Sequence, residues 1–312
     1  MHQTHAQRRS LSEEDGLEPW FRPLVPGQKR RVLRQIRSAR RILTVALWAL
    51  PCIAIQSIFI RSSGTLKIRF ARLFWAGVCR ILGLKLTVRG TLAGTYRDRK
   101  AVERGARPVI FVANHSSWLD IAVLGGVLPT VFVAKSEIAD WPLIKTLARL
   151  GRTIFVTRQR NNTGRELREM TDRLADGDNL LLFPEGTSTD GTRVLPFLSS
   201  FFAIAKPGKA ERPADTVAPP PVIIQPVSLV YDALEGLPIG RTRRSIFAWY
   251  GDMDLAPHVW QFGQWRSAHA TVLLHPPIDP DEFRTRKELA NAVHRIVNEG
   301  TAALRQDRVT DT

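Results

Sequence analysis

The residues of this chain best suited to move a proton are His115 and Asp120, which lie five positions apart after the apolar run 108–113. Their side chains can meet if the chain turns between them. A carboxylate that holds one ring nitrogen fixes the tautomer of an imidazole and leaves the other nitrogen to accept a proton. The pair makes two-thirds of a hydrolase triad, and a substrate hydroxyl would complete it. A merely structural, hydrogen-bonded histidine is the alternative.

A second group of polar residues, Glu185, Gly186 and Thr187, follows another apolar run. Pro184 and Gly186 predict a tight turn that presents an acid, backbone amides and hydroxyls together. Such a turn can bind a polar head group. A plain turn followed by a helix cap is the alternative.

Cations end two further apolar runs. Arg158 is flanked by Arg152 and Arg160, and Lys135 ends the run 131–134. Arginine binds phosphate or carboxylate through paired hydrogen bonds, so Arg158 is a candidate for holding an anionic substrate. Lys135 is the weaker candidate for the same role, and a solvated charge is the alternative for each.

From about Val88 onward, apolar β-rich runs alternate with helical patterns, which predicts an α/β fold with a mixed, mostly parallel sheet flanked by helices. Sites in such sheets lie at the carboxyl ends of strands. We expect Ser116 or Ser117 to cap the helix that follows His115. Pro226 indicates an edge, a bulge or a strand end. The expected strands are 109–113, 131–134, 153–157, 180–183, 222–230, 246–250 and 270–275, and the expected helices are 119–128, 141–150, 164–175, 197–206 and 281–304.

The amino-terminal part has a different character. Residues 29–41 predict a basic amphipathic helix of the kind that binds membrane surfaces. Residues 42–60 are almost wholly apolar, and as a helix they would be roughly 28 Å long, about one bilayer core. Residues 66–86 predict a second amphipathic helix. Cations flank the apolar stretch on both sides, so we expect a hairpin dipping into one leaflet rather than a span; a buried core helix is the alternative. The predicted organisation is a disordered tail (1–28), membrane-associating helices (29–87) and an α/β domain (88–312).

The composition narrows the class of partner. The chain has 45 Lys and Arg against 29 Asp and Glu, a net charge of +16. Such a charge favours nucleic acid, an anionic membrane or an anionic substrate. The densest basic face adjoins the apolar stretch, which nucleic acid does not need, so we expect anionic membrane lipids and no nucleic acid. The two cysteines have no ligand spacing, which argues against a disulfide framework or a metal site.

Four segments, in this order and each at an expected strand end, resemble the glycerolipid acyltransferases typified by lysophosphatidic acid acyltransferase. The resemblance covers roughly residues 70–230. The segments are Asn114-His115-Ser116-Ser117-Trp118-Leu119-Asp120, residues 151–158, Phe183-Pro184-Glu185-Gly186-Thr187-Ser188, and Gln225-Pro226-Val227. The resemblance implies catalysis by His115 and Asp120, acceptor binding by Arg158, Glu185 and Gly186, a position near the site for Pro226, and a two-helix membrane motif.

This resemblance implies transfer of an acyl group from a thioester to the free hydroxyl of 1-acyl-glycerol 3-phosphate, giving phosphatidic acid in phospholipid biosynthesis. The expected partners are the lysophospholipid acceptor and, as co-substrate, acyl-CoA or acyl carrier protein. No metal or other cofactor is required. The expected location is the membrane, at the cytoplasmic face of the bacterial inner membrane.

One segment departs from the family pattern. Many members have Pro-Phe-Lys-x-Gly after the Glu-Gly turn, whereas this chain has Leu198 at the lysine position and Ser200 at the glycine position. It is also similar to bacterial acyltransferases of lyso-ornithine lipid, a zwitterionic acceptor without phosphate. We favour lysophosphatidic acid, with lyso-ornithine lipid or another lysolipid as the alternative. The segment 249–253 is distinctive but receives no role.

Other classes of function are less consistent with the sequence. A lipase-type hydrolase would need an activated serine, and no Gly-x-Ser-x-Gly nucleophile elbow occurs. A membrane-anchored scaffold without catalysis stays open, and it predicts no effect of His115 on acyl transfer.

Overall fold

The computed structural model of the chain describes residues 28–61, 64–135, 151–156, 163–207, 219–306 and 308. The predicted tail and the helix expected over 141–150 lie outside these residues, apart from the last tail residue, Gln28, which begins the first helix.

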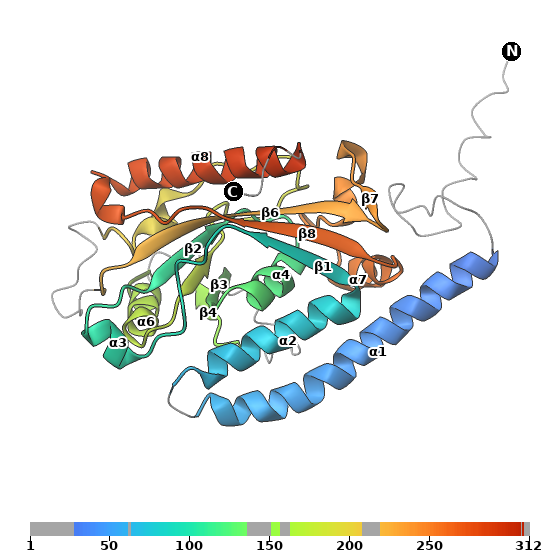
Figure 1. Ribbon diagram of the computed structural model, residues 1–312, viewed down its shortest axis with the longest axis horizontal. Coiled ribbons are helices and arrows are strands. Elements are labelled where there is room, and N and C mark those ends of the chain that lie inside the picture. Colours follow the sequence, from blue (N-terminus) through green and yellow to red (C-terminus); the bar gives the residue numbers. More distant parts are fainter. Residues whose placement is uncertain are drawn as a thin grey trace, which may run out of the picture.

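One sheet organises the molecule (Figure 1). Most neighbouring strands are parallel, and β6 is antiparallel to β8 and β7. In spatial order the strands are β1 (Leu84–Arg89), β8 (Ala268–Leu274), β6 (Ile223–Leu234), β2 (Val109–Ala113), β5 (Leu180–Leu182), β3 (Val131–Lys135) and β4 (Ile154–Val156), with β7 (Leu237–Pro238) paired to β6. The mixed, mostly parallel sheet of the sequence analysis is confirmed.

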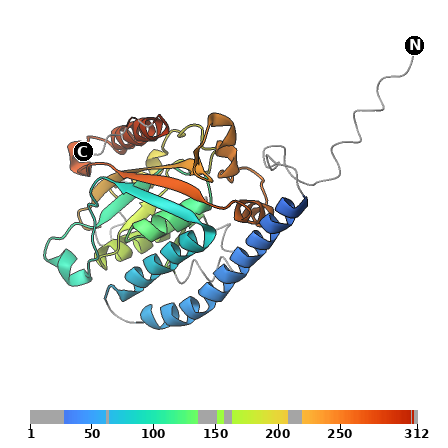
Figure 2. The ribbon, with the colours of Figure 1, turned by 45° about the vertical axis from the view of Figure 1, so that its right-hand side comes forward.

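Helices cover both faces of the sheet, and each face has its own apolar core (Figures 1 and 2). One core joins the sheet to α2 (Leu66–Leu82), α4 (Leu119–Val127) and α7 (Leu255–Gly263). The other joins it to α6 (Thr163–Ala175) and α8 (Arg286–Arg305). The remaining elements are α1 (Gln28–Phe59), α3 (Arg99–Glu103), η4 (Ser199–Phe202), η6 (Arg241–Ile246) and η7 (Pro280–Glu282). Because β2 and β5 are buried on both faces, they appear in the sequence as unbroken apolar runs.

Three sequence expectations about elements are wrong. Residues 246–250 form no strand; Phe247 is buried because it stacks on Tyr231 at 4.8 Å. The helix expected over residues 197–206 is reduced to the short 3-10 helix η4, because serines disfavour a longer helix. The helix expected to reach residue 86 ends at Leu82, because Gly83 takes a left-handed φ of +74°. The strand that follows, β1, was missed; it begins within the segment that the sequence analysis gave to the membrane-associating helices.

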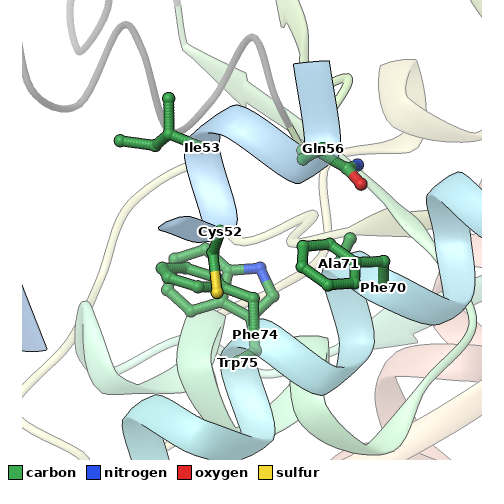
Figure 3. Close-up of a pocket in the computed structure, with 8 residues that line it drawn as sticks. Cys52, Ile53, Gln56, Phe70, Ala71, Phe74 and Trp75 are labelled. Carbon is green, nitrogen blue, oxygen red and sulfur yellow. The ribbon is translucent and has the colours of Figure 1, made fainter. Parts of the chain in front are cut away.

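The two amino-terminal helices form a hairpin along one side of the α/β layers (Figure 1). The basic and apolar segments that the sequence separated are one continuous helix, α1. Gly77 of α2 allows close packing, because a Cβ there would lie 2.6 Å from the Trp48 indole nitrogen. Figure 3 shows the remaining gap between α1 and α2, beside Cys52 and Phe74. Its volume of about 20 Å³ suits a water molecule and not an acyl chain.

Helix α1 is also tied to the α/β domain at its amino-terminal half. The Arg41 guanidinium donates to the carbonyls of Gly263, Trp265 and Arg266 at the end of α7. The Ser38 hydroxyl donates to the Trp260 carbonyl at 2.7 Å. A cation at a helix C-terminus is favourable because the last carbonyls lack partners. These bonds fix the direction of α1 against the domain.

The outer side of α1 is apolar and uncovered. Among the described residues, Arg30–Phe59 is the one helix long and apolar enough to cross a membrane. Its most apolar stretch of 18 residues has a mean hydropathy of 2.0, and 17% of that stretch is buried. We call its outward side the apolar face of α1. Its large exposed side chains are Val32, Leu33, Ile36, Ile42, Leu43, Leu47, Leu50, Ile55 and Ile58. Exposed apolar surface of this extent marks a membrane or protein contact.

Candidate active site

The site begins where β2 ends, with Asn114. Its amide Nδ2 donates to the Leu229 carbonyl at 3.0 Å, and its Oδ1 accepts from the Leu229 N–H at 2.8 Å. These two bonds fasten the end of β2 to β6 and fix where His115 leaves the sheet. The histidine therefore lies at the carboxyl edge of the parallel strands, as predicted.

His115 and Asp120 meet, as the sequence analysis expected. His115 Nδ1 lies 2.8 Å from Asp120 Oδ2, and because a carboxylate only accepts, Nδ1 carries the proton. The His115 ring stacks on Phe183 at 4.2 Å, and its side chain is 20% exposed while that of Asp120 is 0% exposed. Nε2 is therefore the ring nitrogen left to accept a proton, on a ring that solvent or a ligand reaches.

Asp120 receives four hydrogen bonds. Its Oδ2 also accepts from the backbone N–H groups of Ser116 and Ser117, at 2.7 and 2.9 Å. The N-cap residue of α4 is Trp118, which makes no side-chain cap bond, but the Ser117 hydroxyl accepts from the N–H of Leu119, the first residue of α4, at 3.3 Å, so the expected serine contributes from one position earlier. This arrangement holds the 115–120 turn closed around one carboxylate.

The fourth bond comes from Tyr231, a residue that the sequence analysis missed. Its hydroxyl donates to Asp120 Oδ1 at 2.7 Å from a buried position on β6. Burial raises the pKa of Tyr231 well above its usual value, and the neighbouring Asp120 charge adds to the rise. The phenol therefore stays protonated and donates. The available signal was a tyrosine within the apolar run of β6, but its partner is 111 positions away.

Glu185 braces the histidine from the other side. Its Oε1 accepts from the His115 N–H at 2.7 Å and its Oε2 from the Leu195 N–H at 2.8 Å. Burial raises the pKa of Glu185 to about 7, against the lowering effect of these two bonds. Both oxygens are thus engaged with backbone, so this geometry gives Glu185 a positioning task. Acceptor contact by Glu185 stays a prediction.

Gly186 and Thr187 form the exposed part of the same turn. Gly186 has a φ of +68°, and a Cβ there would lie 3.0 Å from Leu198 Cδ1. Thr187 is exposed. Leu198, the residue at the family's lysine position, therefore lies directly over the turn, and it is 51% exposed. An apolar side chain stands here in place of a cation.

Pro226 is in a central strand, between β2 and β8. It pairs with Val112 on one side, and its carbonyl accepts from the His275 N–H at 3.0 Å on the other. The antiparallel ladder with β8 begins at the next residue, Val227. The sequence analysis expected an edge, a bulge or a strand end at Pro226. The strand end is the best description, because the ladder between β6 and β8 stops there, and Pro226 is buried. Contact of Pro226 with substrate stays a prediction.

The predicted cations are only partly described. Arg158 and Arg160 lie outside the described residues, and so does the side chain of Lys135, although β3 does end at Lys135 on the predicted edge. Arg152 does not contribute charge to the site. It is buried in a paired contact with Asp178, at the amino ends of β4 and β5 and thus at the opposite edge of the sheet.

The distinctive segment 249–253 has a structural explanation. The Trp249 N–H donates to the Ser116 carbonyl at 2.8 Å, and the Trp249 indole donates to the Met253 carbonyl at 2.7 Å. The segment thus closes on itself and holds the residue next to His115. In the turn between His115 and Asp120, the Trp118 indole donates to His258 of α7 at 3.0 Å. Burial lowers the pKa of His258 to about 4, which keeps its ring an acceptor.

This fold has a solved counterpart. The crystal structure of the 1-acyl-sn-glycerophosphate acyltransferase PlsC from Thermotoga maritima matches 90% of this chain and 99% of its own, with a TM-score of 0.59 and 21% identity. A family model described as acyltransferase matches residues 95–230, which contain His115, Asp120 and Glu185.

Curated relatives match different shares of the chain. The lyso-ornithine lipid O-acyltransferase of Rhizobium meliloti is 37% identical over 232 residues, which are 74% of this chain and 73% of the relative. The 1-acyl-sn-glycerol-3-phosphate acyltransferase of Neisseria gonorrhoeae is 36% identical over 101 residues, 31% of this chain and 38% of the relative. The chain belongs to the acyltransferase family.

Proposed function

We propose that this chain transfers an acyl group from a thioester to the hydroxyl of a lysolipid, with His115 as general base. The observation that carries the proposal is the His115–Asp120–Tyr231 chain of hydrogen bonds, which leaves Nε2 of an accessible imidazole as a proton acceptor. His115 Nε2 removes the proton from the acceptor hydroxyl as the oxygen attacks the thioester carbonyl. The carbon–sulfur bond then breaks, and the proton passes from His115 to the leaving thiol.

Asp120 has two tasks in this scheme. It orients the ring through Nδ1 and stabilises the imidazolium that forms when Nε2 takes the proton. The backbone amides of Ser116 and Ser117 and the Tyr231 hydroxyl hold the carboxylate in place. Glu185 fixes the backbone of His115. No acyl-enzyme forms, because the acceptor supplies the oxygen, and the donor is acyl-CoA or acyl carrier protein.

For the acceptor we favour lyso-ornithine lipid over our sequence-based preference, lysophosphatidic acid. The relative from Rhizobium meliloti, a lyso-ornithine lipid O-acyltransferase, is similar over 74% of the chain. Leu198 contributes the physical argument: it lies over Gly186, where family members that keep Pro-Phe-Lys-x-Gly have a lysine. A phosphate head group gains from such a cation, whereas a zwitterionic head group without phosphate does not need it.

Lysophosphatidic acid is the second candidate, because the relative from Neisseria gonorrhoeae, a 1-acyl-sn-glycerol-3-phosphate acyltransferase, is 36% identical over 101 residues. Its acylation would give phosphatidic acid.

An acceptor panel tests this choice. Purified protein receives labelled acyl thioester with lyso-ornithine lipid, lysophosphatidic acid or glycerol 3-phosphate. We expect the highest kcat/KM for lyso-ornithine lipid, and Leu198→Lys should raise kcat/KM for lysophosphatidic acid roughly tenfold, the value of one charge-assisted hydrogen bond. Leu237→Lys, a matched change at an exposed position of β7, should not. Preference of the native chain for lysophosphatidic acid would reverse our choice of acceptor.

We also propose that the apolar face of α1 enters one leaflet of a membrane. Helix α1 is bonded to α7 and packs on α2, which keeps it along the domain and favours a monotopic hairpin over a span. Arginines beside this face suit anionic lipid, and the stronger negative potential of a cytoplasmic leaflet favours that face of the bacterial inner membrane.

Vesicle sedimentation tests the membrane contact. A buried leucine side chain contributes about 1.5–3 kcal/mol, so Leu47→Glu with Leu50→Glu should lower partitioning into anionic vesicles at least tenfold. Leu237→Glu, at an equally exposed leucine of β7, should leave partitioning unchanged. Equal binding of both variants would show that another surface holds the lipid.

A further inference from the structure

A second cavity, with a polar lining, lies on the α8 side of the sheet. Its volume is about 370 Å³, and neither His115 nor Asp120 lines it. Strands β1, β8 and β6 contribute one wall, η6 and the turn after β6 another, and the last residues of α8 a third. We call it the α8 chamber. This volume is within the range of small-molecule sites, which is about 300–1,000 Å³.

Three arginines from three separate elements line the α8 chamber: Arg89 of β1, Arg244 of η6 and Arg305 of α8. Asp232 is the single carboxylate among the described residues that line it. The lining therefore carries an excess of positive charge. Burial, and next the Arg244 charge, lower the pKa of Arg305 to about 10, so Arg244 is near enough to Arg305 to act on its charge.

The one carboxylate is already engaged. Asp232 Oδ1 lies 2.5 Å from His269 Nδ1, and Asp232 Oδ2 accepts from the Thr271 hydroxyl at 2.5 Å. His269 Nδ1 therefore carries the proton, and Nε2 faces the Thr87 hydroxyl at 2.9 Å. Both oxygens of Asp232 are thus turned to its neighbours, so an anion in the chamber meets the arginines first.

A backbone irregularity creates this arrangement. The ladder between β6 and β8 shifts register between Tyr231 and Ala233, so Asp232 is the extra residue of a bulge. A bulge changes the direction of a side chain, and bulges are frequent beside functional sites. Here it directs Asp232 at His269 while its neighbour Tyr231 still reaches Asp120.

Arg305 links the chamber to the loop beside the active site. Its two terminal nitrogens donate to the carbonyls of Thr192 and Gly191, at 2.9 and 2.6 Å. Within the described structure, its buried Nε has no hydrogen-bond partner. The loop continues to Thr189, whose N–H donates to the His115 carbonyl at 3.1 Å. Arg305 is therefore held in place by the loop and contributes a fixed positive charge to the wall of the chamber.

We propose that the α8 chamber binds an organic phosphate through Arg89, Arg244 and Arg305. A guanidinium suits phosphate oxygens because it presents planar pairs of donors. Arg305, whose terminal nitrogens are bound to the loop, contributes its positive charge. The chamber is larger than a phosphate ion, so the ligand carries an organic part, which the hydroxyls and apolar side chains of the lining accommodate. The phosphate ester belongs either to the carrier of the acyl donor, a source that rests on the proposed function, or to a free small molecule.

Calorimetry on the full chain in detergent tests the site without any acyl transfer. The probes are coenzyme A, glycerol 3-phosphate and inorganic phosphate, with pantetheine as the unphosphorylated control. We expect saturable binding of a phosphate ester and none of pantetheine. Arg244→Gln should raise the Kd roughly tenfold to hundredfold, the value of a hydrogen bond to a charged group. The Kd of Arg244→Lys should lie between those of the native chain and Arg244→Gln.

Arg241→Gln is the matched control, because Arg241 is exposed on the same short helix and does not line the chamber. Tight binding of coenzyme A, with a raised KM for acyl-CoA in Arg244→Gln, would identify the donor as the source. Binding of glycerol 3-phosphate with no change in that KM would identify a free ester. Failure of every phosphate probe to bind, or binding that Arg244→Gln and Arg89→Gln leave unchanged, would overturn the proposal whether or not acyl transfer is observed.

Discussion

The molecule contains two histidine–aspartate pairs of similar geometry in different surroundings. His115 and Asp120 lie 2.8 Å apart at the edge of the sheet, and His269 and Asp232 lie 2.5 Å apart under α8. In the first pair Asp120 is wholly buried and receives four donors, while in the second both side chains are about one-third exposed. A histidine–carboxylate contact by itself therefore does not define a catalytic site.

What differs is the environment of the second ring nitrogen, Nε2. The His115 side chain is partly exposed, so solvent or a ligand reaches the ring, whereas His269 Nε2 faces the Thr87 hydroxyl within a chamber lined by arginines. The first arrangement suits proton transfer, and the second suits holding an anion. Strand β6 serves both, since Tyr231 supports the first pair and Asp232 belongs to the second.

The largest expected effect separates the two histidines directly. His115→Ala should lower kcat by ~10²–10⁴-fold, because a positioned base contributes about that much. His269→Ala should instead raise the Kd for a phosphate ester. Steady-state kinetics and calorimetry on both variants check this, with vesicle binding as the measure of an intact chain. Near-native turnover of His115→Ala would remove the distinction between the pairs.

A smaller effect tests whether the support of Asp120 matters. Tyr231→Phe keeps the ring that stacks on Phe247 and removes only the hydroxyl donated to Asp120. Loss of one hydrogen bond to a charged group should lower kcat roughly tenfold with little change in KM. The pH profile of kcat/KM is a second readout of whether the hydroxyl acts on the base through Asp120.

Tyr250→Phe is the control, because Tyr250 is exposed and plays no part in the pair. If Tyr231→Phe lowers stability but leaves the pH profile and kcat as in the native chain, the hydroxyl is structural only.

The smallest effect concerns Glu185 and pH. Its pKa is about 7 in the folded chain against a usual 4.5, so between those values the folded state holds a proton that the unfolded state has released. Its contribution to stability is full below about pH 4.5 and is lost as pH rises through about 7. The free energy of unfolding should fall by about 3 kcal/mol across this window.

Glu185→Gln isolates this contribution, because glutamine does not ionise. Unfolding midpoints of both proteins at pH 5 and pH 8 should differ most at the higher pH, where the variant gains relative to the native chain. Burial lowers the pKa of His258 and His275 to about 4, so they act in the opposite sense at low pH, equally in both proteins. A constant difference between the two proteins would contradict the assigned burial of Glu185.

Much of the framework was predictable because it rests on local patterns. The runs that became β2 and β5 are apolar throughout, and His115 and Glu185 follow them directly, so the sheet edge and the first pair were both foreseeable. The errors arose where apolar character has another cause. Phe247 is buried by stacking on Tyr231 and not by strand pairing, and Gly83 ends α2 through a backbone conformation that periodicity does not contain.

The sequence by itself determined most of the strands and helices, the apolar stretch of α1 and the short-range contact of His115 with Asp120, because each depends on residues a few positions apart. Only the tertiary structure decided that Tyr231 supports Asp120, that Leu198 covers Gly186, and that a bulge turns Asp232 toward His269. Those contacts join residues brought together by strand register and side-chain direction, and both of these are fixed by packing across the sheet.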